Sequence, residues 1–152
     1  HIVLATVHSN STASALIRLL DLKVTPLMLA TGISVIISQR LIRQLCKYCK
    51  APAKMSREQI RIFEKKKVNY ANIYDPVGCE HCYGTGYYGR LGIYDILTLD
   101  DDIKAGLANN KLPIENLRKE GDQRGKSNLQ KQALLKVVTC VTSIDEMNRV
   151  VG

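Results

Sequence analysis

The chain contains no tryptophan and only one phenylalanine among its 152 residues. Large aromatic side chains fill much of a single large core, so their scarcity favours small linked subdomains. No segment resembles a secretory signal peptide, which argues against an oxidising compartment and its disulfides. The apolar run at residues 27–38 is interrupted by polar residues and is too short to cross a bilayer, so no transmembrane segment is predicted.

What the chain does have is two C-x-x-C pairs, formed by Cys46 with Cys49 and by Cys79 with Cys82. Each pair directs two sulfur atoms at one point, and two pairs supply the four thiolates of a closed tetrahedral zinc site. Two disulfides would leave Cys140 unpaired, and a thioredoxin-like redox centre needs one pair on a strand-to-helix turn. The sequence therefore predicts one structural Zn²⁺ bound by these four cysteines, with the histidine of the second pair facing solvent or adjoining the site.

The formal net charge is +8 at pH 7. A tetrathiolate zinc site adds four negative and two positive charges, which leaves about +6. Such a surplus favours anionic partners, so a basic zinc module that binds nucleic acid is an alternative function. Modules of that kind interleave aromatic and basic residues on one face, whereas most tyrosines here lie near the second cysteine pair. A purely structural interaction module is a third alternative.

The N-terminal residues combine an apolar segment with a polar loop. Residues 2–6 are predicted to form a buried strand, and His8, Ser9 and Asn10 follow it. Either Ser11 or Thr12 is predicted to cap a helix that runs through residue 19. A polar loop at the end of a buried strand is where α/β proteins place ligand-contacting groups. The strand has no start signal ahead of it, so we expect the chain to be a fragment of a longer protein.

The rest of the chain reads as mostly helical. Thr25 and Pro26 are predicted to begin a buried helix that extends to about residue 45. A capping box at residues 56–59 predicts a short helix between the cysteine pairs, and residues 91–97 are predicted to form a strand. Further helices are predicted at residues 103–108, 114–120, 129–138 and 144–150. Ser143 and Glu146 form a capping box for the last of them.

Two glycine motifs resemble nucleotide-binding loops. Residues 84–89 carry the spacing G-x-G-x-x-G, but they follow a metal turn and precede a strand, whereas the dinucleotide fingerprint follows a strand and opens a helix. Residues 121–127 end like a Walker A loop but have three residues between the glycines where four are needed. We therefore predict no phosphate loop in this chain.

The order of features resembles the C-terminal part of the secretion and pilus ATPases, the family of general secretory pathway protein E and its relatives that extend type IV pili. The segments that carry this resemblance are residues 1–10, similar to the family's histidine box, residues 38–41, the four cysteines, residues 84–93 and residues 141–150. Cys140 stands where members of this family usually have glycine.

The resemblance implies an α/β remnant of a RecA-like ATPase domain at residues 1–45, a four-cysteine zinc-binding subdomain at 46–97 and a C-terminal helical subdomain at 98–152. It implies a cytoplasmic homo-hexamer, peripheral at the inner membrane, that couples ATP hydrolysis to pseudopilus assembly in type II secretion, with type IV pilus extension as the alternative. Its implied partners are the inner-membrane secretion platform proteins, and no nucleic acid.

In that family His8 would lie near the γ-phosphate of ATP. The family's phosphate loop, its acidic box and its Walker B segment all precede the histidine box. The resemblance therefore implies that ATP and Mg²⁺ bind in the full-length parent and that this chain alone is inactive.

Overall fold

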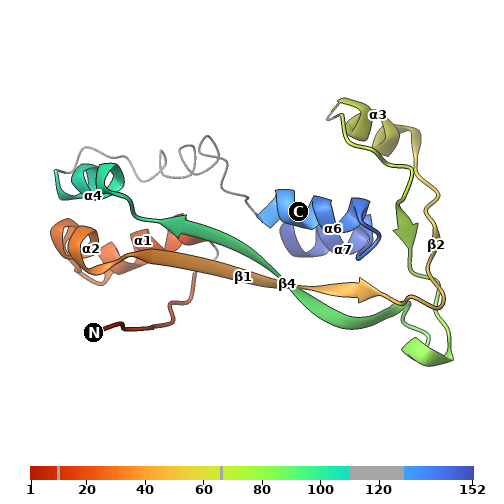
Figure 1. Cartoon of the computed structure of the whole chain (residues 1–152), viewed down its shortest axis with the longest axis horizontal. Helices are drawn as coiled ribbons and strands as arrows, with labels where there is room; N and C mark the ends of the chain where they lie inside the picture. Colours follow the sequence, from red (N-terminus) through yellow and green to blue (C-terminus); the bar gives the residue numbers. More distant parts are fainter. Residues whose placement is uncertain (10, 66, 110–128) are drawn as a thin grey trace. The chain divides into compact units, whose positions relative to one another are not determined.

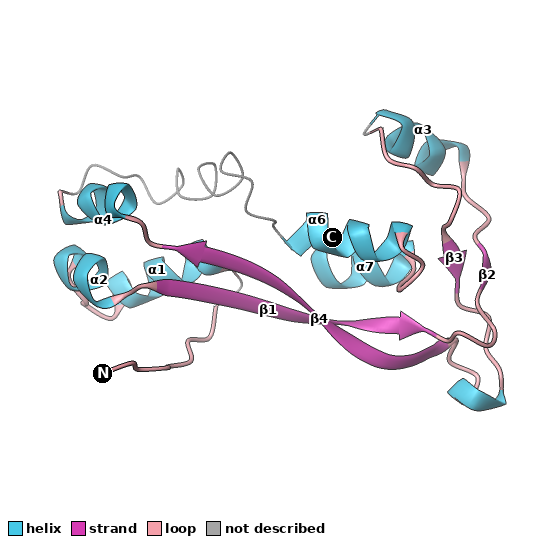
Figure 2. Cartoon of the chain, viewed as in Figure 1, coloured by secondary structure: helices cyan, strands magenta, loops and turns pink. Residues whose placement is uncertain are grey.

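The structure is a computed structural model that describes residues 1–9, 11–65, 67–109 and 129–152 (Figure 1). Within these residues it has six α-helices, one 3₁₀ turn and two two-stranded sheets (Figure 2). The helices are α1 (Thr12–Asp21), α2 (Pro26–Gly32), α3 (Arg57–Lys65), α4 (Asp101–Ala108), α6 (Leu129–Val138) and α7 (Ile144–Val151), with the 3₁₀ turn η1 at Glu80–Cys82. The strands are β1 (Val35–Leu45), β2 (Ala51–Pro52), β3 (Tyr74–Asp75) and β4 (Tyr87–Thr98).

The chain forms two compact units. Unit 1 consists of residues 1–39 and 94–128, and unit 2 consists of residues 40–93 and 129–152. The paired strands β1 and β4 each contribute residues to both units. The three subdomains expected from the resemblance, with boundaries after residues 45 and 97, stay a prediction about the full-length protein.

Unit 1 is built by α1, α2 and α4 with the end of β4. The predicted helix starts are confirmed, since Ser11 Oγ accepts the Ser14 N–H at 3.1 Å and Thr25 Oγ1 accepts the Met28 N–H at 3.3 Å. The core of the unit is made by aliphatic side chains that are at most 5% exposed: Leu16, Leu29, Ala30, Leu97, Leu99, Ile103 and Leu107. These contacts hold the three helices together because burying each aliphatic side chain contributes roughly 1.5–3 kcal/mol.

Unit 2 contains α3, α6, α7 and the cysteine pairs. The capping box of α3 is confirmed, with the Ser56 N–H donating to Gln59 Oε1 at 2.8 Å and the Gln59 N–H donating to Ser56 Oγ at 3.2 Å. One cluster of buried side chains joins Phe63 and Ile73 to Val137 and Ile144, and a second joins Ile42, Ile93 and Ala133. Strands β2 and β3 pair antiparallel between the cysteine pairs. The segment between the cysteines therefore packs against α6 and α7.

The predicted buried helix from Pro26 to about residue 45 begins at the predicted residue, but its predicted length is wrong. Helix α2 ends at Gly32, its residues Leu27 and Met28 are 61% and 63% exposed, and residues 35–45 form β1. Exposure alternates along residues 35–41, as it does on a strand. The β-branched residues of this stretch favour strand, and pairing with β4 supplies hydrogen-bond partners that its sequence alone does not reveal.

The predicted buried strand at residues 2–6 is also wrong. Residues 1–9 have no helix or strand, and Ile2 and Leu4 are 95% and 94% exposed. A strand forms only beside a neighbour, and the two sheets of the described part consist of β1 with β4 and β2 with β3. The strand predicted at 91–97 is confirmed within the longer β4. The helices predicted at 103–108, 129–138 and 144–150 are confirmed as α4, α6 and α7, and the helix at 114–120 lies outside the described residues.

None of the helices in the described part of the chain is long and apolar enough to cross a membrane.

Candidate metal centre

Two tight backbone turns position the four cysteine side chains. In the first, the carbonyl oxygen of Cys46 accepts the N–H groups of Cys49 and Lys50 at 3.4 and 3.1 Å. In the second, the carbonyl oxygen of Cys79 accepts the N–H groups of Cys82 and Gly84 at 3.2 and 2.9 Å. Each turn thus folds its two cysteines onto the same side of the backbone, as the C-x-x-C spacing predicts.

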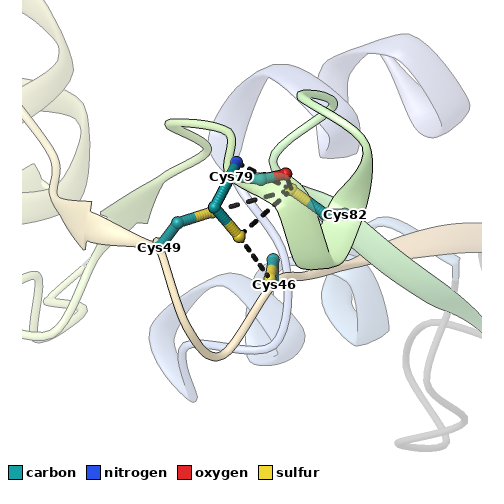
Figure 3. A group of neighbouring side chains, drawn as sticks. All are labelled: Cys46, Cys49, Cys79 and Cys82. Carbon is teal, nitrogen blue, oxygen red and sulfur yellow. Dashed lines mark hydrogen bonds between the residues drawn. The ribbon is translucent and has the colours of Figure 1, made fainter.

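The four sulfur atoms converge on one point (Figure 3). All lie within 4.8 Å of one another. Cys46 Sγ is 3.9 Å from Cys79 Sγ, and Cys82 Sγ is 3.8 Å from Cys49 Sγ and 3.7 Å from Cys79 Sγ. Sulfur atoms bound to zinc at ~2.3 Å in a regular tetrahedron stand ~3.8 Å apart. The donor set therefore fits a four-coordinate zinc ion.

Backbone N–H groups surround this cluster. Gly78 donates to Cys49 Sγ at 3.3 Å, and Cys79 and Gly86 both donate to Cys82 Sγ at 3.2 Å. Burial raises the pKa of Cys82, but the two N–H donors, together with hydrogen bonds from the Cys79 and Cys49 thiols, outweigh it and lower the pKa to about 6. Burial raises the pKa of Cys49 to about 11. A thiolate is therefore easier to form at Cys82 than at Cys49, and a bound cation would favour four thiolates.

The glycine-rich stretch after the second pair serves the turn, as predicted, and leads into β4. Gly86 has φ +74°, and a Cβ at this position would lie 2.4 Å from Pro76 Cβ. Gly78 has φ +112°, and a Cβ there would lie 2.6 Å from the carbonyl oxygen of Gly84. Only glycine allows this backbone packing around Cys82. The other motif, at residues 121–127, lies outside the described residues.

The histidine of the second pair, His81, is exposed, as predicted. Its ring centroid lies 4.1 Å from that of Tyr48. The imidazole therefore packs on the outer side of the turn and leaves the four sulfur atoms as the donors of the cluster.

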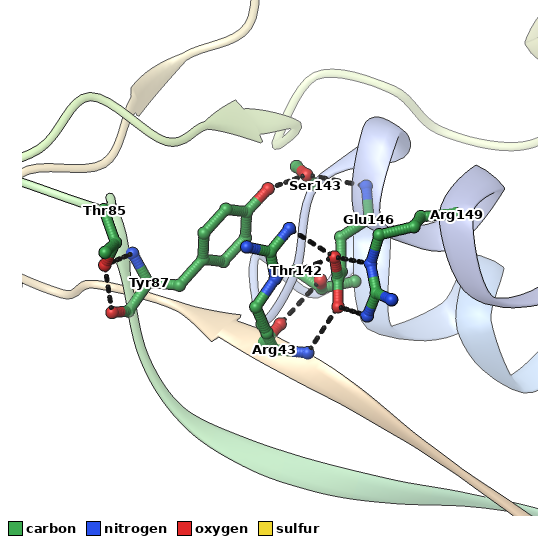
Figure 4. A network of polar contacts seen from close by, with 7 residues as sticks. All are labelled: Arg43, Thr85, Tyr87, Thr142, Ser143, Glu146 and Arg149. Carbon is green, nitrogen blue, oxygen red and sulfur yellow. Dashed lines mark hydrogen bonds and ion pairs between the residues drawn. The ribbon is translucent and has the colours of Figure 1, made fainter.

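Unit 2 also contains a buried carboxylate that the sequence does not predict (Figure 4). Glu146 is 0% exposed and accepts from Arg43 Nε at 2.9 Å, Arg43 Nη2 at 2.7 Å, Arg149 Nε at 2.8 Å and Arg149 Nη2 at 2.7 Å. Its Oε1 also accepts the backbone N–H of Arg43 at 2.9 Å. Burial raises the pKa of Glu146, but the donors from Arg149 and Arg43 outweigh it and lower the pKa to about 2.

The predicted capping box of α7 is therefore half correct. Ser143 Oγ accepts the Glu146 N–H at 3.1 Å, whereas the Glu146 carboxylate turns to the two arginines. The Arg43 guanidinium lies 4.1 Å from the centroid of the Tyr87 ring, and Tyr87 Oη shares a hydrogen bond of 2.7 Å with Ser143 Oγ. These contacts join β1, β4 and the N-terminal end of α7 (Figure 4).

The other predicted site residue, His8, belongs to unit 1. It is exposed and precedes Ser11, the N-cap of α1, by three residues. Ser9 Oγ donates to the carbonyl oxygen of Ser11 at 3.2 Å, so the loop leads directly into the helix cap. Asn10 lies outside the described residues.

Known proteins match nearly the whole length of the chain. Residues 1–149 match the family described as type II/IV secretion system protein. The chain belongs to the type II/IV secretion system protein family. Members similar to it include the type IV pilus assembly ATPase TfpB of Acinetobacter baylyi, which is 37% identical over 99% of this chain and 26% of its own length. The type IV pilus assembly ATPase PilB of Pseudomonas aeruginosa matches equally, at 37% identity with the same coverage.

Members named for type II secretion match as well. The type II secretion system protein E of Dickeya dadantii is 35% identical over 99% of this chain and 29% of its own length. The resemblance found in the sequence is thus confirmed, and both the secretion and the pilus interpretations fit the family. The chain spans between a quarter and a third of the length of these curated relatives.

Proposed function

We propose that the full-length protein containing this chain is an ATPase that powers assembly of a pseudopilus or a type IV pilus. The observation that carries this proposal is the family match along residues 1–149, whose relatives include proteins named as pilus assembly ATPases and as type II secretion protein E. By this proposal residues 1–45 belong to a RecA-like ATPase domain of a homo-hexamer. The hexamer binds ATP and Mg²⁺ and acts on the cytoplasmic side of the inner membrane with the secretion platform proteins.

Within that protein, we propose that Cys46, Cys49, Cys79 and Cys82 bind one structural Zn²⁺. Three of the sulfur separations lie between 3.7 and 3.9 Å, near the edge length of a zinc tetrathiolate. Four thiolates fill the coordination shell and leave no position for water. The metal therefore supplies a cross-link between the two turns, and the chemistry of ATP hydrolysis belongs to other residues.

His8 is proposed to contact the γ-phosphate of ATP in the full-length protein. It lies in a polar loop, with Ser9, immediately before the N-terminal end of α1. Replacement of His8 with alanine is expected to reduce ATP turnover by ten-fold or more, roughly the effect of losing one positioned group. The measurement is steady-state hydrolysis by the purified assembly, with exposed His81→Ala as the control. Unchanged turnover in a normally assembled His8→Ala protein would contradict the role.

The chain by itself is proposed to hydrolyse no ATP. Phosphoryl transfer needs a phosphate cradle, a magnesium carboxylate and a residue that orients the nucleophile, and the sequence offers no complete set. The check is a magnesium-dependent ATPase assay of the purified 152-residue chain, for which no turnover above the blank is expected. Turnover well above the blank would mean that residues 121–127 form a working phosphate loop.

One observation favours the nucleic-acid alternative. Unit 2 has 14 Lys and Arg against six Asp and Glu, whereas unit 1 has eight of each, so the whole basic surplus lies with the cysteine cluster. A salt titration of binding to mixed-sequence DNA separates the two functions, because the affinity of a true binder falls steeply with salt. The ATPase proposal expects no such binding.

A further inference from the structure

Residues that flank the first cysteine pair form hydrogen bonds with the linker between α6 and α7. We define this α6–α7 linker as residues 139–143. At the end of β1, the Leu45 N–H donates to the carbonyl oxygen of Val141 at 2.8 Å, and Thr142 Oγ1 donates to the carbonyl oxygen of Arg43 at 2.8 Å. Lys50 Nζ donates to the carbonyl oxygen of Cys140 at 3.0 Å. Arg43 and Leu45 lie within three residues before Cys46, and Lys50 directly follows Cys49.

The second cysteine turn is connected to the same linker through Tyr87 of β4. Gly86 donates its N–H to Cys82 Sγ at 3.2 Å and accepts the Cys46 N–H at 2.9 Å. Thr85 Oγ1 donates to the carbonyl oxygen of Cys82 at 2.7 Å. The same oxygen accepts the Tyr87 N–H at 3.2 Å (Figure 4). The Tyr87 hydroxyl then meets Ser143, which caps α7. The position of the tyrosine thus depends on the turn that holds Cys82.

The Arg43–Glu146 ion pair depends on the same geometry. Glu146 is fully buried, and three of its contacts come from the side chain and backbone of Arg43. Arg43 precedes Cys46 by three residues and rests on the Tyr87 ring. A buried carboxylate that loses one of its two arginines is strongly disfavoured, so α7 stays docked only while this strand end is fixed.

We propose that metal binding by the four cysteines controls the docking of α7, through the α6–α7 linker and the Arg43–Glu146 ion pair. This proposal rests on the zinc site proposed above, and it adds control of α7 docking to the cross-linking of the two turns. The segment between Cys46 and Cys82 has few apolar residues of its own, and its Phe63 and Ile73 pack on Val137 of α6 and Ile144 of α7. Release of the cysteine turns therefore withdraws the polar contacts and one of the two apolar clusters of α7. The other cluster, formed with Ile42, Ile93 and Ala133, remains.

Considered from the sequence alone, chelation is expected to unfold residues 46–82 and to leave the flanking helices protected. The contacts described here extend the expected loss to residues 139–151. They also limit it to unit 2, because the core of unit 1 is formed by α1, α2, α4 and the end of β4.

The first test is hydrogen exchange of the zinc-loaded protein before and after chelation, with a reductant present to keep the cysteines reduced. We expect α7 amides to exchange at least about ten-fold faster after chelation, a typical size for coupling between two sites. Amides of α1 and α4 are the internal control and should not change. Unchanged exchange in α7, or equal acceleration in both units, would overturn the proposal.

The second test uses the reciprocity of coupling, because a change that undocks α7 must weaken metal binding by the same factor. We expect Glu146→Gln to accelerate α7 exchange in the loaded protein and to raise the Kd for Zn²⁺ by about ten-fold. Asp145→Asn is the matched control, since its carboxyl is exposed on the same helix turn, and it should change neither quantity.

A milder variant guards against a failure of Glu146→Gln to fold. Tyr87→Phe removes only the hydroxyl that meets Ser143 and keeps the ring under Arg43. It should produce smaller shifts of both quantities in the same direction. An α7 that loosens in either variant while the Kd for Zn²⁺ stays at the wild-type value would refute the coupling and leave the zinc site itself intact.

Discussion

Replacement of Cys82 with serine is expected to abolish stoichiometric zinc binding and to unfold the segment between the cysteine pairs. Cys82 is 2% exposed, and its sulfur lies 3.7–3.8 Å from those of Cys79 and Cys49. A serine hydroxyl remains protonated near neutral pH and cannot replace a thiolate ligand. Since metal binding at such sites contributes on the order of 10 kcal/mol to folding, loss of one ligand should remove most of that stabilisation.

The measurement is elemental analysis together with hydrogen exchange of residues 46–82. The wild-type protein should contain one zinc per chain, and Cys82→Ser far less. Cys140→Ser is the matched control, because Cys140 lies outside the cluster and its thiol donates to the carbonyl oxygen of Asn72 at 3.0 Å. It should keep a full zinc complement. A metal-free wild-type protein with its cysteines oxidised would refute the site.

Acidification from pH 5 to pH 2 is expected to lower the free energy of unfolding by about 3 kcal/mol through protonation of Glu146 alone. The pKa of this carboxyl falls from 4.5 to about 2 on folding. Below about pH 4.5 this carboxyl is protonated in the unfolded chain but not in the folded chain. The free energy of unfolding therefore falls as the pH drops from about 4.5 to the folded pKa of about 2. Each unit of difference in pKa corresponds to about 1.4 kcal/mol, which gives the expected size.

The free energy of unfolding, measured by urea titration at several pH values, should fall more steeply for the wild-type protein than for Glu146→Gln. Zinc dissociates from both proteins in acid, and Glu146→Gln is expected to lose it at a higher pH. The zinc content is therefore measured at each pH, and slopes are compared only where both proteins hold the metal. Asp145→Asn removes an exposed carboxyl from the same helix turn and should keep the wild-type slope. Equal slopes in the wild-type and Glu146→Gln proteins would show that the arginines do not hold the carboxylate charged.

The sequence predicts features whose partners lie a few residues apart. The starts of α1, α2 and α3 were readable because Ser11, Thr25 and Ser56 each bind an N–H within the next three residues. The cysteine cluster was readable for the same reason, since each C-x-x-C turn forms locally and two turns complete one donor set.

Features that depend on distant partners were missed or wrong. The apolar residues 33–37 were assigned to a helix because nothing near them in the sequence indicates that β4 pairs with them. The spacing of Glu146 from Ser143 predicts that its carboxylate forms the second half of a capping box. One of its two arginine partners, Arg43, lies 103 residues earlier. An ion pair of that separation leaves no local pattern, because tertiary packing alone brings the two residues together.

Unit 2 is formed by two segments that are far apart in the sequence, residues 40–93 and 129–152, so its parts are synthesised at different times. All four metal ligands exist once residue 82 has left the ribosome, whereas the carboxylate that fixes Arg43 belongs to residue 146. At roughly 5–20 residues per second the interval between the two is several seconds. The nascent chain therefore carries all four cysteines before α7 has been translated, and the last step in closing unit 2 is the docking of that helix.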